Sequence, residues 1–340
     1  MAQIADPHRI AELPRPADRR TAIAVGALLV AVALVVSVGD PGRFAWVRTF
    51  FVIFGSLLIQ ALPFVMFGAL AAALVEVFVP IGTFEKLGAL PRPLQLPAAA
   101  LAGIAFPICE CGSVPVARRL MQRGLMPSAA VTFMLAAPVL NPVVIASTFV
   151  AFRGRTTLWT MVGGRFLLGM VVAIAVGWVI GNRSKDELLK PNPEEAHEHL
   201  MELGRPEARW RRFFVHLGND FLFMGRFLLL GATIAAAIQT FLPTSVLTGL
   251  AERPVVSVLA MMGLAAALSL CSESDAFVAA SFVQFGPSAM LGFLVFGPMV
   301  DLKLVALYAG TFRRPFTRTV VLVAAAATLV GALWVGVAFG

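Results

Sequence analysis

The chain has 340 residues, of which 59% are hydrophobic and only 14% are charged, and its formal net charge is +8. Soluble domains average roughly 45–50% apolar and about 25% charged residues, so the composition excludes an ordinary soluble enzyme, a disordered protein and a secreted disulfide scaffold. The basic residues lie between apolar runs rather than in one patch, which argues against nucleic-acid binding. The composition predicts an all-α, polytopic membrane protein whose surroundings are the lipid bilayer.

Long apolar runs give the expected membrane spans, because a transmembrane helix needs about 20 mostly apolar residues. These runs cover 21–38, 49–79, 128–151, 157–181, 213–242, 287–310 and 319–339. Residues 1–20 are polar and basic, and no convincing cleavage site follows them. We therefore expect a cytoplasmic tail and a retained first helix rather than a signal peptide.

Two further apolar stretches, 94–108 and 254–270, are shorter than a span. Each leads into a polar patch and then into a second short segment: ICECGSVP at 108–115 before 116–125, and CSESDA at 271–276 before 277–285. Short apolar pieces broken by Pro, Gly or Ser are typical of a re-entrant hairpin or a discontinuous helix. The alternative is a full crossing followed by an ordinary loop.

The chain contains an internal repeat. Residues 50–80 align without a gap on 213–243, with 11 identities in 31 positions, including Gly68 with Gly231. Further along, Cys111 aligns with Cys271, although a two-residue gap would pair Cys109 instead. The sequence thus predicts one extra N-terminal helix followed by two homologous halves.

The distribution of Lys and Arg predicts how the halves are oriented. If the N-terminus is cytoplasmic and both short segments are re-entrant, 19 of the 27 basic residues lie inside and five lie in outer loops, as the positive-inside rule requires. A full crossing of 94–108 would move Arg118, Arg119 and Arg123 outside and weaken this bias. The two halves then have opposite orientations, which is the inverted repeat of many secondary transporters.

The three cysteines of the chain, Cys109, Cys111 and Cys271, all lie at the two polar breaks. In an inverted repeat such breaks approach each other near the bilayer midplane, where substrate sites are built. We expect the three thiols to meet there. The alternative is that each cysteine packs as a small hydrophobic residue.

Polar residues accompany the thiols. Charges inside a bilayer cost at least ~2.5–3.5 kcal/mol each on insertion scales and mark function unless they are paired, and carboxyl groups held away from water are candidate proton carriers. An unwound segment also leaves backbone groups and hydroxyls free to bind a solute. The predicted substrate-binding residues are Cys109, Cys111, Cys271, Glu110, Ser113, Ser272, Glu273, Ser274, Asp275, Asn141 and Asp301.

Other charges in the spans have a structural interpretation as well as a functional one. Asp301 and Lys303 follow the break at Gly297 and Pro298 and are candidates for an ion pair. Asp220 and Arg226 lie six residues apart on one predicted helix, so they need not meet each other. Mutual neutralisation is the structural alternative for such pairs.

Thiolates select soft centres such as Cu(I) and Zn, and trivalent arsenic and antimony bond to two or three sulfurs. Cys109, Cys111 and Cys271 are therefore also candidate ligands of a soft metal or metalloid. Their spacing is neither that of a structural zinc site nor the C-x-x-C of a redox protein. The chain lacks a phosphate-binding loop, and no cofactor is predicted. We expect His197 and His199 to belong to a solvated loop rather than to a metal site.

The segments FPICECGSVPVARRL, PVLNP and SLCSESDAFVAASF resemble the predicted-permease family that contains YraQ and the ArsP-type organoarsenical efflux permeases. The resemblance covers the chain from about Phe50 to the C-terminus. It implies a prokaryotic inner-membrane permease, and it implies that Cys109, Cys111 and Cys271 contact the substrate.

Together, the resemblance and the patterns predict five regions: a cytoplasmic tail (1–20), an extra N-terminal helix and loop (21–48), a first permease repeat (49–181), a cytoplasmic linker (182–212) and a second permease repeat (213–340). The linker is the expected docking place for a soluble partner, and a homodimer is the other partner considered.

Two functions from different classes remain open at this point. The first is a secondary permease, not an enzyme, which moves a small thiophilic solute outward, with trivalent organoarsenicals as the preferred cargo and a metal ion or small sulfur compound as alternatives. The second is a membrane thiol oxidoreductase in which Cys109 and Cys111 cycle between dithiol and disulfide. The inverted repeat and the polar residues expected at the midplane favour transport, and a purely scaffolding role would not need buried carboxylates.

Overall fold

The computed structural model describes residues 45–78, 91–105, 108–181, 183–190, 209–241 and 253–339. Within these ranges the secondary structure is helical, apart from one isolated bridge between Leu189 and Phe312, so the all-α prediction is confirmed there. Residues 50–190 and 209–340 form one compact unit. The predicted tail 1–20, the predicted helix 21–38 and most of the linker lie outside the described residues.

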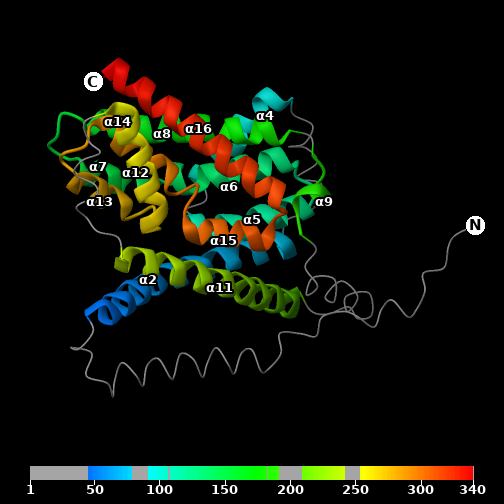
Figure 1. The fold of residues 1–340 in the computed structure, drawn as a ribbon. Helices are drawn as coiled ribbons and strands as arrows, with labels where there is room; N and C mark the ends of the chain where they lie inside the picture. Colours follow the sequence, from blue (N-terminus) through cyan, green and yellow to red (C-terminus); the bar gives the residue numbers. More distant parts are fainter. Residues whose placement is uncertain are drawn as a thin grey trace, which may run out of the picture. The chain divides into compact units, whose positions relative to one another are not determined.

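The helices of the described residues are labelled in Figure 1. They are α2 (Ala45–Phe78), α4 (Arg92–Ala105), α5 (Glu110–Gln122), α6 (Pro127–Leu140), α7 (Pro142–Ala151), α8 (Leu158–Ile180), α9 (Lys185–Leu188), α11 (Arg209–Phe241), α12 (Pro254–Leu268), α13 (Asp275–Ser281), α14 (Pro287–Phe296), α15 (Leu302–Thr311) and α16 (Arg314–Phe339).

Five helical segments of the described part are long and apolar enough to cross a membrane: Trp46–Leu74, Pro127–Ala151, Leu158–Ile180, Leu217–Thr240 and Arg314–Ala338. They confirm five of the predicted spans. Large apolar side chains on their outer faces, such as Val52, Leu222 and Val330, are exposed, as lipid-facing residues are.

The expectation of one continuous span over 287–310 is wrong, while the break expected at Gly297 and Pro298 is present. This run is divided into α14 and α15, and Gly297–Asp301 separates the two helices. Pro298 lies in this connection and has no backbone N–H to continue the hydrogen bonding of α14. The run 128–151 is interrupted in a similar way, because Pro142 begins α7 directly after Asn141.

The two predicted breaks are present. Helices α4 and α12 have 14 and 15 residues, so each is only about 21–23 Å long, whereas the hydrocarbon core of a bilayer is about 30 Å thick. Helix α12 ends at Ser269, whose φ of 48° is left-handed. The polar patches therefore follow short helices that stop before they could span a bilayer.

Helix contacts occur in matching pairs that follow the repeat register. Helix α4 packs on α6 as α12 packs on α14, and α5 contacts α15 as α13 contacts α7. Helices α8 and α16, which end the two repeats, pack against each other. This pattern agrees with two related halves, while their inverted orientation stays a prediction.

Two glycines of the repeat allow helices to approach closely. A methyl group at Gly68 of α2 would overlap the backbone of Gly112 in α5, and one at Gly231 of α11 would lie 2.6 Å from the Cα atom of Lys303 in α15. These two glycines are aligned in the repeat. Each long helix therefore touches a short helix that begins after a break, α2 touching α5 and α11 touching α15.

Candidate functional site

The first polar break ends in the N-terminus of α5. Cys109 is the N-cap residue, and Glu110 and Cys111 occupy the first turn of the helix. All three side chains are buried. The partial positive charge of a helix N-terminus stabilises a carboxylate in the first turn, so the local structure favours Glu110 at this position.

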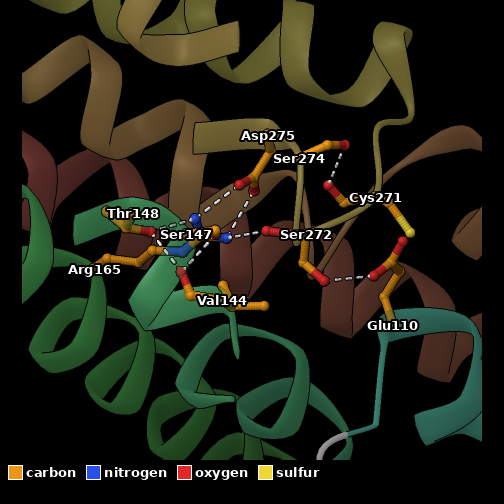
Figure 2. A network of polar contacts seen from close by, with 9 residues as sticks. All are labelled: Glu110, Val144, Ser147, Thr148, Arg165, Cys271, Ser272, Ser274 and Asp275. Atoms are coloured by element: carbon orange, nitrogen blue, oxygen red, sulfur yellow. Dashed lines mark hydrogen bonds and ion pairs between the residues drawn. The ribbon is translucent and has the colours of Figure 1, made fainter. Parts of the chain in front are cut away.

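The two breaks touch each other through a hydrogen bond. The Ser272 hydroxyl donates to Oε2 of Glu110 at 2.8 Å, and both residues are buried (Figure 2). These residues are 162 positions apart in the chain and belong to different repeats. The contact brings the second half's CSESDA segment directly to the start of α5.

A buried lysine joins this contact. The Lys303 ammonium in α15 lies 3.6 Å from Oε1 of Glu110 and 3.6 Å from Oδ2 of Asp301. The predicted pairing of Asp301 with Lys303 is therefore present, and Glu110 shares the same cation. Asp301 also caps α15, because its Oδ1 accepts a hydrogen bond from the backbone N–H of Leu304 at 2.6 Å.

Arg165 of α8 binds the beginning of α13. Its guanidinium forms two hydrogen bonds with the Asp275 carboxylate, at 2.8 and 2.7 Å, and also donates to the Ser272 carbonyl at 3.2 Å and to the Thr148 hydroxyl at 3.0 Å (Figure 2). Bidentate contacts of this kind are both strong and geometrically specific. Arg165 therefore fixes the second break against α7 and α8.

The three cysteines are buried free thiols at the two breaks. Cys109 lies near Cys111 and Cys271, and Cys111 and Cys271 both lie near Lys303. The sulfur of Cys271 lies next to the Glu110 carboxylate (Figure 2). Thiols from both halves are therefore gathered around one buried polar cluster.

Other predicted site residues make contacts within their own segments. The hydroxyl of Ser113 donates to the Glu110 carbonyl, and that of Ser274 donates to the Cys271 carbonyl. Asn141 caps α7 by accepting a hydrogen bond from Val143. Asn141 and Asp301 thus have the same role, because each caps the short helix that follows a break.

One carboxylate of the predicted site has a ligand-like arrangement. A carboxylate oxygen of Glu273, one of Glu110 and the sulfur of Cys271 all lie within 4.8 Å of one another. Glu273 itself is half-buried. Among the described residues, these three side chains form the cluster whose ligand atoms lie close enough together to hold a metal ion.

Three contacts of the cluster were not predicted from the sequence: Arg165 with Asp275, Thr148 with Arg165, and Lys303 with Glu110. A usable signal exists for the two basic residues, because each is a cation within an apolar run and such charges are rare unless they are paired or functional. No signal exists for Thr148. Like many threonines in helices, it has a hydroxyl that donates to the backbone carbonyl one turn earlier, here that of Val144.

A second ion pair joins the halves away from this cluster. Arg119 of α5 forms two hydrogen bonds with Asp220 of α11, at 3.2 and 3.0 Å, while the Arg226 guanidinium lies over the Phe223 ring. Asp220 is therefore paired with Arg119 of the other half rather than with Arg226, which lies six residues away on the same helix.

Membrane-spanning helices combined with short helices that end at buried, mutually contacting polar breaks are typical of a membrane transport protein. In agreement, residues 47–336 match the model of a family described as "Predicted permease" (ArsP_1). The chain belongs to this predicted permease family, which confirms the resemblance found in the sequence.

Two relatives are similar to this chain over most of their length. The chain is 38% identical over 285 residues to "UPF0718 protein YcgR" of Bacillus subtilis (strain 168), which covers 83% of this chain and 95% of the relative. It is 33% identical over 267 residues to the "Putative two-component membrane permease complex subunit" of Streptococcus mutans serotype c, covering 78% and 87%. No solved structure matches the chain significantly.

Proposed function

We propose that this permease exports trivalent organoarsenicals, and that Cys109, Cys111 and Cys271 bind the arsenic. The observation that carries the proposal is the burial of all three thiols at two breaks that contact each other. Soft thiolate ligands suit thiophilic centres. A secondary permease rather than an enzyme is the consistent class, because the chain belongs to a permease family.

The chemistry at the site is a ligand exchange. Methylarsenite enters as a neutral dihydroxide, and two thiols each form an As–S bond while the two hydroxyl groups leave as water with the thiol protons. The third thiol then attacks the arsenic and displaces one of the first two, which regains a proton. Such exchange between three thiols lowers the barrier to release. Glu110 and Glu273 are the neighbouring groups that can carry the protons.

Transport also requires that the bound solute be exposed to each side in turn. The contacts of α5 with α15 and of α7 with α13 join the two halves at the breaks. In the proposed mechanism the halves rock against each other about these short helices, as in other inverted-repeat transporters. The membrane orientation proposed for this motion has the N-terminus in the cytoplasm and the chain in the inner membrane of a prokaryotic cell.

The test is uptake of methylarsenite into everted membrane vesicles, with and without a proton gradient. The wild type is compared with Cys109→Ser, Cys111→Ser and Cys271→Ser, and with Ser281→Ala at the exposed end of α13 as a control. We expect the wild type and the control to accumulate the arsenical. The initial uptake rate of each cysteine variant should fall at least about tenfold, since hydroxyls do not replace soft thiolates.

Wild-type accumulation that persists in all three cysteine variants would overturn the three-thiol site. Absence of accumulation by the wild type would overturn the choice of cargo. Expression of each variant is checked by its amount and by its elution as a single species in detergent, so that a folding defect is not mistaken for a transport defect.

A partner is proposed as well. The relative from Streptococcus mutans bears a name that describes a subunit of a two-component complex, which supports a second component for this chain too. The linker 182–212 is the proposed docking place, with self-association into a homodimer as the other arrangement. The molecular mass of the purified complex in detergent, measured with and without replacement of 191–208 by a Gly-Ser segment, distinguishes these cases.

A further inference from the structure

Three ligand-type side chains from both halves converge beside the thiols. Glu110 comes from the first turn of α5, whereas Cys271 and Glu273 come from the break before α13. One ligand atom from each lies within 4.8 Å of the other two. Cys109 and Cys111 are not part of this group, so it differs from the three-thiol arrangement.

Two oxygens in this group have no hydrogen-bond donor. Oε1 of Glu110 and Oε2 of Glu273 are buried and unsatisfied, although buried polar atoms are nearly always hydrogen-bonded. The Lys303 ammonium approaches Oε1 of Glu110 only to 3.6 Å. The Glu110 side chain is itself fully buried, so water does not compensate this oxygen at the surface.

The charge balance of the cluster points the same way. Its ionisable carboxylates and cations are Glu110, Glu273, Asp275, Asp301, Arg165 and Lys303. Arg165 is held in the bidentate pair with Asp275, and Lys303 is shared by Glu110 and Asp301. With all groups ionised, two negative charges remain without a partner, and a buried charge is costly unless it is paired or coordinates a metal. A divalent cation neutralises them.

We propose that Glu110, Glu273 and Cys271 bind a divalent cation of intermediate softness, of the Zn²⁺ class. A thiolate with two carboxylates suits this class, because Zn²⁺ accepts sulfur and oxygen ligands, while Mg²⁺ prefers oxygen alone. Three protein ligands leave a fourth position of a tetrahedral ion open. On binding, the Cys271 thiol releases its proton to solvent.

This inference deepens the proposed function, on which it rests, since it takes the cluster as the transport site and adds a cation to it. The cation and the arsenical share Cys271, so they compete for that ligand. Cation binding also draws Glu110 away from Lys303, which keeps Asp301 as its partner. Lys303 therefore opposes the cation, and its removal strengthens cation binding.

The probe is Cd²⁺ alone, added to the full chain purified in detergent, because a cadmium–thiolate bond gives a charge-transfer absorption that reports Cys271. We expect one Cd²⁺ per chain and competition by Zn²⁺ but not by Mg²⁺. The variants Cys271→Ser, Glu110→Gln and Glu273→Gln lose affinity by at least about tenfold, and Ser272→Ala, which removes the donor to Glu110, loses about 10–100-fold as outer-shell changes do. The matched control is Glu187→Gln, an exposed carboxylate of α9.

Lys303→Met is expected to increase the affinity for Cd²⁺, whereas a folding defect would decrease it. This change removes the competing cation, so Cd²⁺ binds more tightly than to the wild type and raises the thermal unfolding midpoint of the variant more. Unchanged or weaker binding in Lys303→Met, or Cd²⁺ binding that Glu110→Gln and Glu273→Gln leave intact, would overturn the proposal. Equal losses in Cys109→Ser, Cys111→Ser and Cys271→Ser would assign Cd²⁺ to the three thiols instead and overturn it too.

The two proposals fail separately. Methylarsenite uptake without specific Cd²⁺ binding overturns the cation site and leaves the arsenical site standing. Cd²⁺ binding without methylarsenite uptake overturns the choice of cargo and keeps the cation site.

Discussion

At the scale of single residues, Arg165 joins three segments of the cluster. It is fully buried, and its guanidinium contacts Asp275, Ser272 and Thr148. Removing one partner of a buried ion pair costs about 3–5 kcal/mol, because the other charge stays buried without compensation, whereas replacing both by apolar residues is often neutral. The contact therefore specifies how the second break sits against α7 and α8 more than it stabilises the fold.

We predict that Asp275→Asn lowers the stability of the chain by about 3–5 kcal/mol, and that the double variant Arg165→Met with Asp275→Leu recovers most of the loss. Thermal unfolding in detergent measures both. Arg153→Gln, at an exposed position in the α7–α8 connection, is the control and should leave the midpoint unchanged. A double variant as unstable as the single one would contradict this account of the pair.

The sequence located most candidate residues of the cluster but not their partners. Cys109, Cys111 and Cys271 stand out because they are the whole cysteine content and lie in polar patches. The partner of Asp275 lies 110 positions away and that of Glu110 lies 162 positions away. Nothing in the local pattern specifies such distant pairs, because they depend on how the helices pack.

At the scale of elements, the repeat-matched glycines set the distance between long and short helices. Gly68 meets Gly112 of α5, and Gly231 meets Lys303 of α15. Close backbone approach through small residues is a common device of membrane helix packing. It holds the N-terminal turns of α5 and α15, with Glu110 and Lys303, against α2 and α11.

We predict that Gly68→Ala and Gly231→Ala destabilise the chain, because each added methyl group overlaps a neighbouring helix backbone. The matched controls are Gly55→Ala on α2 and Gly225→Ala on α11, where a methyl group would meet nothing within 4 Å. Alanine stabilises a helix by roughly 0.5–1 kcal/mol relative to glycine, so the controls should rise in thermal midpoint while the two variants fall. Parallel behaviour of variants and controls would sink this account.

Hydropathy reveals helix breaks only where polar residues mark them, whereas the break at Gly297 and Pro298 is indicated by those two residue types alone. The patches after α4 and α12 contain charges and serines, so hydropathy reveals them. The break between α14 and α15 lies in GPMVD, whose residues before Asp301 are apolar or small, and a hydropathy profile passes over it. There the backbone, through Gly297 and Pro298, interrupts the helix without lowering the apolar character of the run.

At the scale of the whole molecule, the inverted orientation of the halves is open to a direct test. The charge pattern predicts that Arg153 and Arg253 face outward and that Ser184 and Arg314 face the cytoplasm. All four side chains are exposed. Single cysteines at these positions, in a chain whose native cysteines are replaced by serine, report their side of the membrane to an impermeant maleimide.

We predict that Arg153→Cys and Arg253→Cys are labelled in intact cells, while Ser184→Cys and Arg314→Cys are labelled only after the membrane is opened. This pattern follows from the positive-inside rule. Labelling of Arg253→Cys from the cytoplasmic side, with Arg153→Cys labelled from outside, would mean that the halves are not inverted as predicted.

The start of the linker is held at the ends of two helices whose beginnings form the cluster. The Lys190 carbonyl accepts a hydrogen bond from Arg118 near the end of α5, and the Lys190 ammonium donates to the Ala309 carbonyl near the end of α15. A pull on the linker is therefore transmitted along both rigid helices at once, to Glu110 and to Lys303. A displacement of Lys190 would thus act on the distance between the Glu110 carboxylate and the Lys303 ammonium from the far ends of their helices.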